Sequence, residues 1–255
     1  MTEENRATPF CVRLADTVIR IEPMFEYVRE YCREYITKEQ AAFTVRVEVS
    51  DIAFERERSA REAEREGRTD ESYSDSYLET LAVYRRIAED LPMLNTVLFH
   101  GSVIAVDGQG YLFTAKSGTG KSTHTGLWRE LMGSRAVMVN DDKPLLKITE
   151  KGVFAYGTPW DGKHRLSTNI SVPLKAICVL TRDTDNHIAE IQPKEAYQML
   201  LQQSYRPMDR NAMMQSLKLI DEMMKKTKFY RLGCNKNKEA ARVAYEGMSG
   251  EKWED

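Results

Sequence analysis

The chain has 255 residues and a formal net charge of -2, from 37 basic and 39 acidic side chains. This length is enough for one large domain, or for a domain with a small additional module. The balanced charge excludes the basic excess typical of nucleic-acid-binding proteins, and no apolar run approaches the roughly 20 residues that span a bilayer. We therefore expect neither a nucleic-acid partner nor a membrane partner.

The cysteines and the polar N-terminus indicate a cytoplasmic protein of bacterial type. Cys11, Cys32, Cys178 and Cys234 are scattered, without the spacing of a metal site or of a disulfide framework. Reduced thiols are the default for such a pattern. The polar first five residues do not resemble a signal peptide.

Residues 1–92 are predicted to form a small α+β module. Loose alternation over residues 10–21 indicates a strand, or a hairpin about Asp16. Residues 23–35 open on a proline and are predicted to be helical, and the alternating residues 43–49 are predicted to be a half-buried strand. Two roles stay open for this module: presenting a substrate, or covering an edge of a sheet.

An Arg/Glu-rich stretch follows at residues 55–68. Alternating charge of this kind predicts a solvated helix or a mobile linker, and less readily a surface for a charged partner. Ser72 and Asp75 have the spacing of a capping box, which predicts the start of another helix.

The most informative motif is residues 115–123, Ala-Lys-Ser-Gly-Thr-Gly-Lys-Ser-Thr. Its spacing is that of a phosphate-binding loop, in which glycines let backbone N–H groups point at phosphate oxygens. In such a loop Lys121 reaches the outer phosphates and the Ser122 hydroxyl ligates Mg²⁺. Residues 111–114 are a predicted strand and residues 123–131 a predicted helix, which is the context that the motif requires. The candidate nucleotide-binding residues are Ser117, Gly118, Thr119, Gly120, Lys121, Ser122 and Thr123.

An acidic pair is predicted to lie beside this loop. Residues 99–106 and 111–114 flank a Gly-rich turn, which indicates an antiparallel hairpin. Residues 135–139 form the next predicted strand, and it ends at Asn140-Asp141-Asp142. Sheets of α/β proteins place ligands at the carboxyl ends of their strands, and adjacent side chains on a strand point to opposite faces. We therefore expect the two carboxylates beside the phosphates, in different roles. Arg129, by helical spacing, is expected to point away from the phosphates.

A loop with projecting cations is predicted after the acidic pair. Residues 156–162 contain Gly-Thr-Pro and Asp-Gly turn signals, and Lys163, His164 and Arg165 follow. Cations in this place would hold an acceptor's anion or stabilise a transferring phosphoryl group. The alternative is an exposed turn with ordinary surface charges. Trp160 either packs in the core or stacks on a ligand.

The rest of the chain is predicted to alternate strands and helices. The predicted strands are residues 174–180, with residues 187–191 as the neighbouring strand, and residues 228–232; the predicted helices are residues 193–203, residues 207 or 209 to about 226, and residues 236–248.

These motifs together resemble the HPr kinase and phosphoenolpyruvate carboxykinase superfamily, and most of all the HPr-kinase-related proteins of bacteria. The shared features are a hairpin carrying His-Gly, the Gly-x-Gly-Lys-Ser loop and an Asp-Asp pair on the adjacent strand. The resemblance covers about residues 95–247 and includes the Phe-Tyr-Arg-Leu segment at residues 229–232 before an Ala-rich helix. It implies an α/β fold, with a P-loop kinase core and mixed sheet over residues 93–255, and ATP and Mg²⁺ as cofactors.

The resemblance also implies roles for individual residues. Lys121 would bind the β- and γ-phosphates, and Asp141 would take the proton from an attacking hydroxyl. Asp142 would lie on the metal side, and His100 near the acceptor. The catalytic candidates are Asp141, Lys121, His100, Lys163 and Arg165, and the metal candidates are Ser122 and Asp142, with Thr123 in reserve.

The expected activity is transfer of the γ-phosphoryl group of ATP to a hydroxyl. The acceptor is either a serine in a protein or peptide, or a small hydroxylated metabolite. Residues 156–165 replace the Arg-Gly-Leu-Gly segment of HPr kinases, so the resemblance does not extend to HPr as the acceptor. Two alternatives stay open, a nucleotide-binding regulatory module without turnover and a phosphorylase or phosphatase using the same site. A homo-oligomer is also left open.

Overall fold

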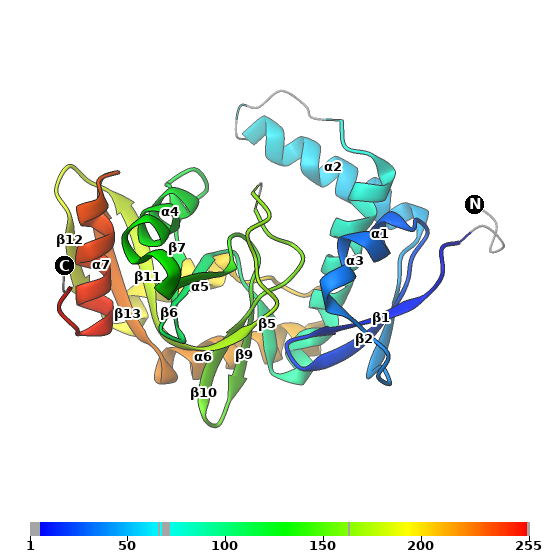
Figure 1. Ribbon diagram of the computed structural model, residues 1–255. Helices are drawn as coiled ribbons and strands as arrows, with labels where there is room; N and C mark the ends of the chain where they lie inside the picture. The colour runs from blue at the N-terminus through cyan, green and yellow to red at the C-terminus, as the bar shows by residue number, and fades with distance from the viewer. Residues whose placement is uncertain (1–5, 66, 68–71, 163, 254–255) are drawn as a thin grey trace. The chain divides into compact units, whose positions relative to one another are not determined.

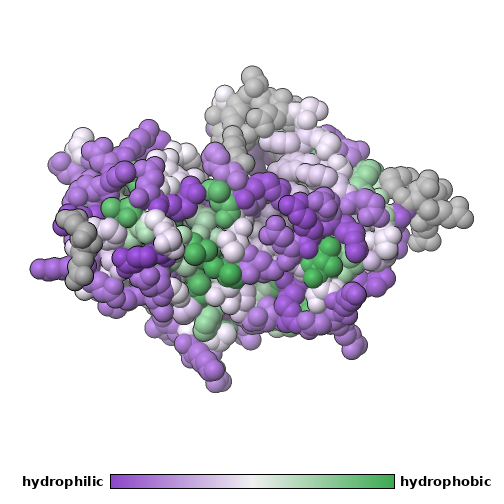
Figure 2. Space-filling model, viewed as in Figure 1, coloured by the Kyte–Doolittle hydropathy of each residue, from purple (hydrophilic) through white to green (hydrophobic). Residues whose placement is uncertain are grey.

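A computed structural model of the chain describes residues 6–65, 67, 72–162 and 164–253. The chain divides into two compact units, Met1–Asp90 and Leu91–Asp255. Both units contain a β-sheet and helices (Figure 1). Hydrophilic residues cover most of the visible surface, and hydrophobic residues show as a few separate patches (Figure 2). Among the described residues, no helix is long and apolar enough to cross a membrane.

The first unit is built on a four-stranded sheet in the order β3-β1-β2-β4. Its described elements are β1 (Phe10–Leu14), β2 (Thr17–Glu22), α1 (Tyr27–Tyr31), a 3-10 turn (Arg33–Tyr35), β3 (Ile36–Thr37), β4 (Phe43–Arg46), α2 (Val49–Arg65) and α3 (Asp75–Asp90). Ala15 and Asp16 join β1 to β2 with φ angles of 47° and 59°, as a two-residue hairpin turn requires. The predicted hairpin about Asp16 is confirmed.

Three boundaries in this unit differ from the sequence prediction. The helix predicted from residue 23 begins only at Tyr27, because the buried Glu79 carboxylate accepts the N–H groups of Met24 and Phe25 at 2.5 and 2.9 Å. The strand predicted to residue 49 ends at Arg46, and α2 begins at Val49. The Ser74 hydroxyl, not that of Ser72, accepts the N–H of Tyr77 at the start of α3.

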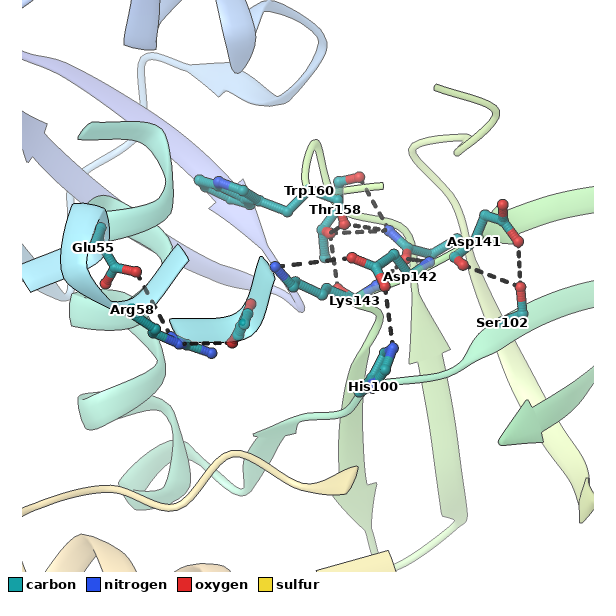
Figure 3. Close-up of polar contacts among 11 residues, drawn as sticks. Glu55, Arg58, His100, Ser102, Asp141, Asp142, Lys143, Thr158 and Trp160 are labelled. Carbon is teal, nitrogen blue, oxygen red and sulfur yellow. Dashed lines mark hydrogen bonds and ion pairs between the residues drawn. The ribbon is translucent and has the colours of Figure 1, made fainter. Parts of the chain in front are cut away.

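The Arg/Glu-rich stretch is not a linker within its described part, because α2 is helical through Arg65. It is also not wholly solvated. Glu55 is 2% exposed and accepts a 2.5 Å hydrogen bond from Arg85 of α3. Arg85 also pairs with Asp51 at 2.7 Å, and Figure 3 shows Glu55 beside Arg58 on the same helix. Buried ion pairs therefore hold α2 against α3.

Arg85→Gln is expected to lower the free energy of unfolding by about 2–3 kcal/mol, because it leaves two buried carboxylates without their main cation. Burial raises the pKa of Asp51, but hydrogen bonds from Arg85, the Glu48 N–H and Arg86 hold it below its usual value. A carboxylate with a lowered folded pKa stabilises the fold at neutral pH and loses this effect as pH falls through that pKa. Urea unfolding between pH 7 and pH 3 should show this loss of stability at acid pH in the wild type, and a smaller loss in the variant. Arg33→Gln, which removes only two exposed ion pairs, is the control and should change stability little; equal effects of both variants would contradict the account.

The second unit is a mixed α/β fold on a nine-stranded sheet. Its strands are β5 (Thr96–Leu98), β6 (Ser102–Val106), β7 (Gln109–Thr114), β8 (Ala136–Asn140), β9 (Leu145–Thr149), β10 (Gly152–Tyr156), β11 (Ser171–Arg182), β12 (His187–Glu190) and β13 (Lys228–Cys234). Its helices are α4 (Lys121–Met132), α5 (Pro193–Gln203), α6 (Arg210–Lys226) and α7 (Lys238–Ser249), with 3-10 turns at Leu91–Leu94 and Gly133–Arg135.

The long strand β11 joins two parts of this sheet. Its first residues pair with β10 in the series β5-β9-β10-β11, and its later residues lie between β7 and β13, parallel to both. The remaining pairings of these strands are antiparallel, so the sheet is mixed. The predicted hairpin is confirmed as β6–β7, with its turn at Asp107 and Gly108. The strand predicted as the neighbour of β11 is not its neighbour: β12 pairs with β13, which lies between them.

Helices cover both faces of the sheet. α4 and α7 contact each other on one face, over a core that includes Phe113, Trp128 and Tyr245 (Figure 1). α5 and α6 pack on a second core that includes Phe99 and Phe229. Helix α5 has the predicted bounds, and α6 begins after an Asp209 cap, as predicted. These two layers fix the edge of the sheet at which the candidate site lies.

Candidate functional site

Strand direction brings several segments to one edge of the sheet. β6 is antiparallel to both β7 and β8, with Ser102 opposite Phe113 and Val103 opposite Asn140. The start of β6 therefore lies beside the ends of β7 and β8. β11 runs parallel to β7, so its last residue, Arg182, comes to the same edge.

The glycine-rich loop connects β7 to α4 at this edge. Gly118 and Gly120 have φ angles of 74° and 122°, in the region that side chains other than glycine's rarely adopt. α4 begins at Lys121, so the first N–H groups of the helix have no partner within the helix and face an anion favourably. Arg182 donates to the carbonyl oxygens of Gly118 at 2.6 Å and Thr119 at 3.4 Å. This contact fixes the outer turn of the loop.

Asp141 lies directly after β8 and is 5% exposed. The Ser102 hydroxyl donates to its carboxylate and contacts its backbone carbonyl at 3.1 Å (Figure 3). A Cβ at Gly162 would stand 3.0 Å from the second carboxylate oxygen of Asp141. Ser102 therefore fixes one side of the Asp141 carboxylate, and the backbone of Gly162 lies close to the other.

Asp142 points to a different set of partners. His100 Nε2 is 3.3 Å from one carboxylate oxygen, and Lys143 Nζ is 3.8 Å from the other (Figure 3). Burial raises the pKa of Asp142, but the His100 hydrogen bond and the charges of Lys143, His100 and Lys121 hold it below the usual value. Asp142 is thus an ionised carboxylate within the field of the loop lysine, and the two acidic residues have distinct surroundings.

Buried Asn140 organises both the acidic turn and the segment after it. Its side-chain oxygen accepts the N–H groups of Asp142 at 2.9 Å and Lys143 at 2.6 Å. Its amide nitrogen donates to Thr158, with the hydroxyl at 3.0 Å. Gly157 lies next to this contact, where a Cβ would be 1.9 Å from the Thr168 carbonyl oxygen. Trp160 is 2% exposed, so of the two alternatives for this residue its side chain packs in the core.

A cavity of about 190 Å³ opens between the loop helix and the acidic turn. Its lining residues are Ser122, Thr123, Thr125, Arg129, Asp141, His164 and Leu166. Arg129, which was expected to point away from the phosphates, lines this cavity together with Ser122 and Asp141. The reason is helical spacing: positions 122, 125 and 129 lie on one face of α4.

The structure therefore brings only some of the predicted site residues together. Ser122, Thr123 and Asp141 line one cavity, and Lys121 and His100 act on Asp142. Arg165 is exposed at a turn with φ of 47° and does not line the cavity. Lys163 lies outside the described residues. Sequence reasoning missed Ser102, Asn140, Thr158 and Arg182, although Ser102 and Asn140 directly adjoin the motifs that it used.

The oxygen ligands at this edge fit Mg²⁺ only in part. Across the described residues, no group of three or more His, Cys, Asp or Glu side chains is arranged to hold a metal ion. Mg²⁺ often takes just one or two protein oxygens and completes its shell with phosphate oxygens and water. The Ser122 hydroxyl, exposed at the start of α4, and the ionised Asp142 suit such a shared site.

A protein family described as SynChlorMet cassette protein ScmC matches residues 71–236, more than half of the chain. The chain belongs to this ScmC family. The matched range contains the glycine-rich loop, the acidic pair and the cavity residues of this family member.

Two further comparisons, with curated proteins and with solved structures, do not indicate a function. No curated protein matches the chain. Among solved structures, the chain is similar to the Hpr(Ser) kinase/phosphatase from Coxiella burnetii, with 14% sequence identity and a TM-score of 0.26 over 48% of this chain and 86% of that chain. A likeness this low assigns no activity.

Proposed function

We propose that this ScmC family member is a kinase that transfers the γ-phosphoryl group of ATP to a hydroxyl group. The observation that carries the proposal is the cavity that Ser122 of the loop helix shares with Asp141. Phosphoryl transfer needs a phosphate cradle, charge neutralisation and a base near the nucleophile. Residues suited to all three lie at one edge of the sheet.

Residues 117–123 would hold the phosphates of the nucleotide, with Lys121 on the outer ones. Ser122 and Asp142 would hold Mg²⁺, whose charge would neutralise the phosphate oxygens. The lowered pKa of Asp142 supports this role, because a metal ligand must be ionised at neutral pH. Arg182 would keep the loop carbonyls turned outward, so that its N–H groups face the phosphates.

Asp141 would act as the base. The acceptor hydroxyl gives its proton to the Asp141 carboxylate as its oxygen bonds to the γ-phosphorus. The bond from that phosphorus to the bridging oxygen breaks, and ADP leaves with the electron pair. The Ser102 hydrogen bond holds one oxygen of Asp141, which leaves the other oxygen to take the proton. The same site run in reverse would act as a phosphorylase, and a site without an acceptor would act as a nucleotide-binding module.

Lys121→Met is expected to weaken Mg-ATP binding by about 10- to 100-fold, the effect of losing contacts between a charged donor and phosphate. Isothermal titration calorimetry with Mg-ATP measures this loss. Lys194→Met, an exposed lysine at the start of α5, is the matched control and should bind like the wild type. Equal affinity of wild type and Lys121→Met would remove the loop from nucleotide binding and overturn the proposal.

A further inference from the structure

The cavity beside Asp141 carries cationic and hydrogen-bonding side chains that the proposed transfer does not use. Arg129 and His164 line it together with Asp141. Arg129 lies seven positions after Ser122 on one face of α4, and helical side chains lean toward the N-terminus of their helix. Arg129 therefore lies on the same face of α4 as Ser122, and it lines the cavity that contains Asp141.

The Arg129 side chain is also unpaired in the described part of the chain. Within the described ranges its side chain makes no hydrogen bond and no ion pair, not even with the Asp141 carboxylate of the same cavity. Arg135 and Arg242 of the same unit, in contrast, pair with Asp107 and Glu246. A guanidinium beside a cavity and without a partner is suited to bind a carboxylate or phosphate from solution.

The polar side chains near the acidic pair fall into two sets. Lys121, His100 and Lys143 act on Asp142, the proposed metal-side carboxylate. Arg129 and His164 instead share the cavity with Asp141, the proposed base, and with Ser122 and Thr123 of the loop helix. Because the acceptor hydroxyl is proposed to meet Asp141 in this cavity, we assign an anion held there by Arg129 to the acceptor.

The size of the cavity limits the acceptor. About 190 Å³ is below the roughly 300 Å³ at which pockets for drug-sized ligands begin. Such a space admits a hydroxyl-bearing carbon with an anionic group a few bonds away.

We propose that Arg129, assisted by His164, forms an anion subsite for the acceptor, and that the acceptor is a small hydroxy acid bearing a carboxylate or phosphate. This inference rests on the proposed function and narrows it. Arg129 selects the acceptor and holds its hydroxyl toward Asp141; it takes no part in proton transfer.

The test compares charged and uncharged hydroxyl compounds on the protein saturated with Mg²⁺ and a non-hydrolysable ATP analogue. The probes are D-glycerate, glycerol 3-phosphate and glycerol, titrated by calorimetry. We expect at least one of the two acids to bind at least about tenfold more tightly than glycerol, and the two acids separate carboxylate from phosphate preference. Arg129→Gln should abolish the difference, Arg129→Lys should restore part of it, and Arg242→Gln should leave it intact. Equal binding of acids and glycerol, or unchanged binding in Arg129→Gln, overturns the inference.

Turnover separates this inference from the proposed function. For any acceptor that the enzyme phosphorylates, Arg129→Gln should raise the acceptor KM at least about tenfold, with kcat within about threefold and Mg-ATP affinity unchanged. Arg129-dependent binding of acids without any phosphoryl transfer would refute the kinase and leave the anion subsite standing. Efficient transfer to uncharged hydroxyls, equal in wild type and Arg129→Gln, would refute the subsite and leave the kinase standing.

Discussion

Asp141→Asn should reduce acceptor-dependent ADP release from Mg-ATP by at least about 100-fold, the usual contribution of a positioned base. The amide keeps the size of the carboxylate and its contact with Ser102 but cannot take a proton from the acceptor. The nucleotide should still bind, with a dissociation constant within about twofold of the wild type, because no part of Asp141 lies in the loop. A coupled assay for ADP and a Mg-ATP titration measure the two effects separately.

Asp107→Asn makes the same chemical change at the far end of the β6–β7 hairpin. Asp107 has a positive φ of 50°, which asparagine adopts readily, and it pairs with exposed Arg135. This control should keep full turnover. Normal turnover in Asp141→Asn would show that another group is the base.

Gly157→Ala should destabilise the second unit by at least about 3 kcal/mol, the upper range for forced overpacking. The added methyl carbon would lie 1.9 Å from the Thr168 carbonyl oxygen and 2.7 Å from that of Val139. Both contacts are backbone atoms, so no side-chain rotation relieves them. The strain would also displace the neighbouring Thr158, which binds Asn140, so turnover should fall together with stability.

Gly126→Ala is the matched control for this substitution. Gly126 lies within α4, and a Cβ there would meet no atom within 4 Å. Alanine is the better helix former by about 1 kcal/mol, so this variant should be as stable as the wild type or more stable. Urea unfolding measures both variants, and a Gly157→Ala protein of wild-type stability would contradict the packing seen around that residue.

Most of the second unit could be predicted from its sequence, because its signals are local. The β6–β7 hairpin, α5 after its proline and α6 after Asp209 follow from turn residues and caps. The pairing of β12 with β13 could not be predicted, because it depends on a strand some 40 residues further along the chain inserting beside β11. Likewise, the burial of Glu55 depends on Arg85 of another helix, and the periodicity of α2 holds no sign of it.

The candidate site was predictable where it rests on one continuous motif. The loop and the acidic pair are motifs of this kind, and β8 ends at Asn140 as expected. The role of Asn140 was not predictable, because its side chain joins two segments that are 18 residues apart. Arg129 was not predicted as a site residue for another reason. Its spacing from Ser122 places both residues on one face of α4, but the sequence alone does not show that this face lies toward Asp141.

The central claim is that the shared cavity transfers a phosphoryl group to a hydroxyl. The most direct measurement is transfer of label from γ-labelled Mg-ATP to a pool of hydroxyl-bearing acids, sugars, polyols and peptides. The account predicts that label appears in a stable phosphoester with the wild type, and not with Asp141→Asn. Bound nucleotide with no labelled ester from any member of the pool, or label released only as inorganic phosphate, would contradict it.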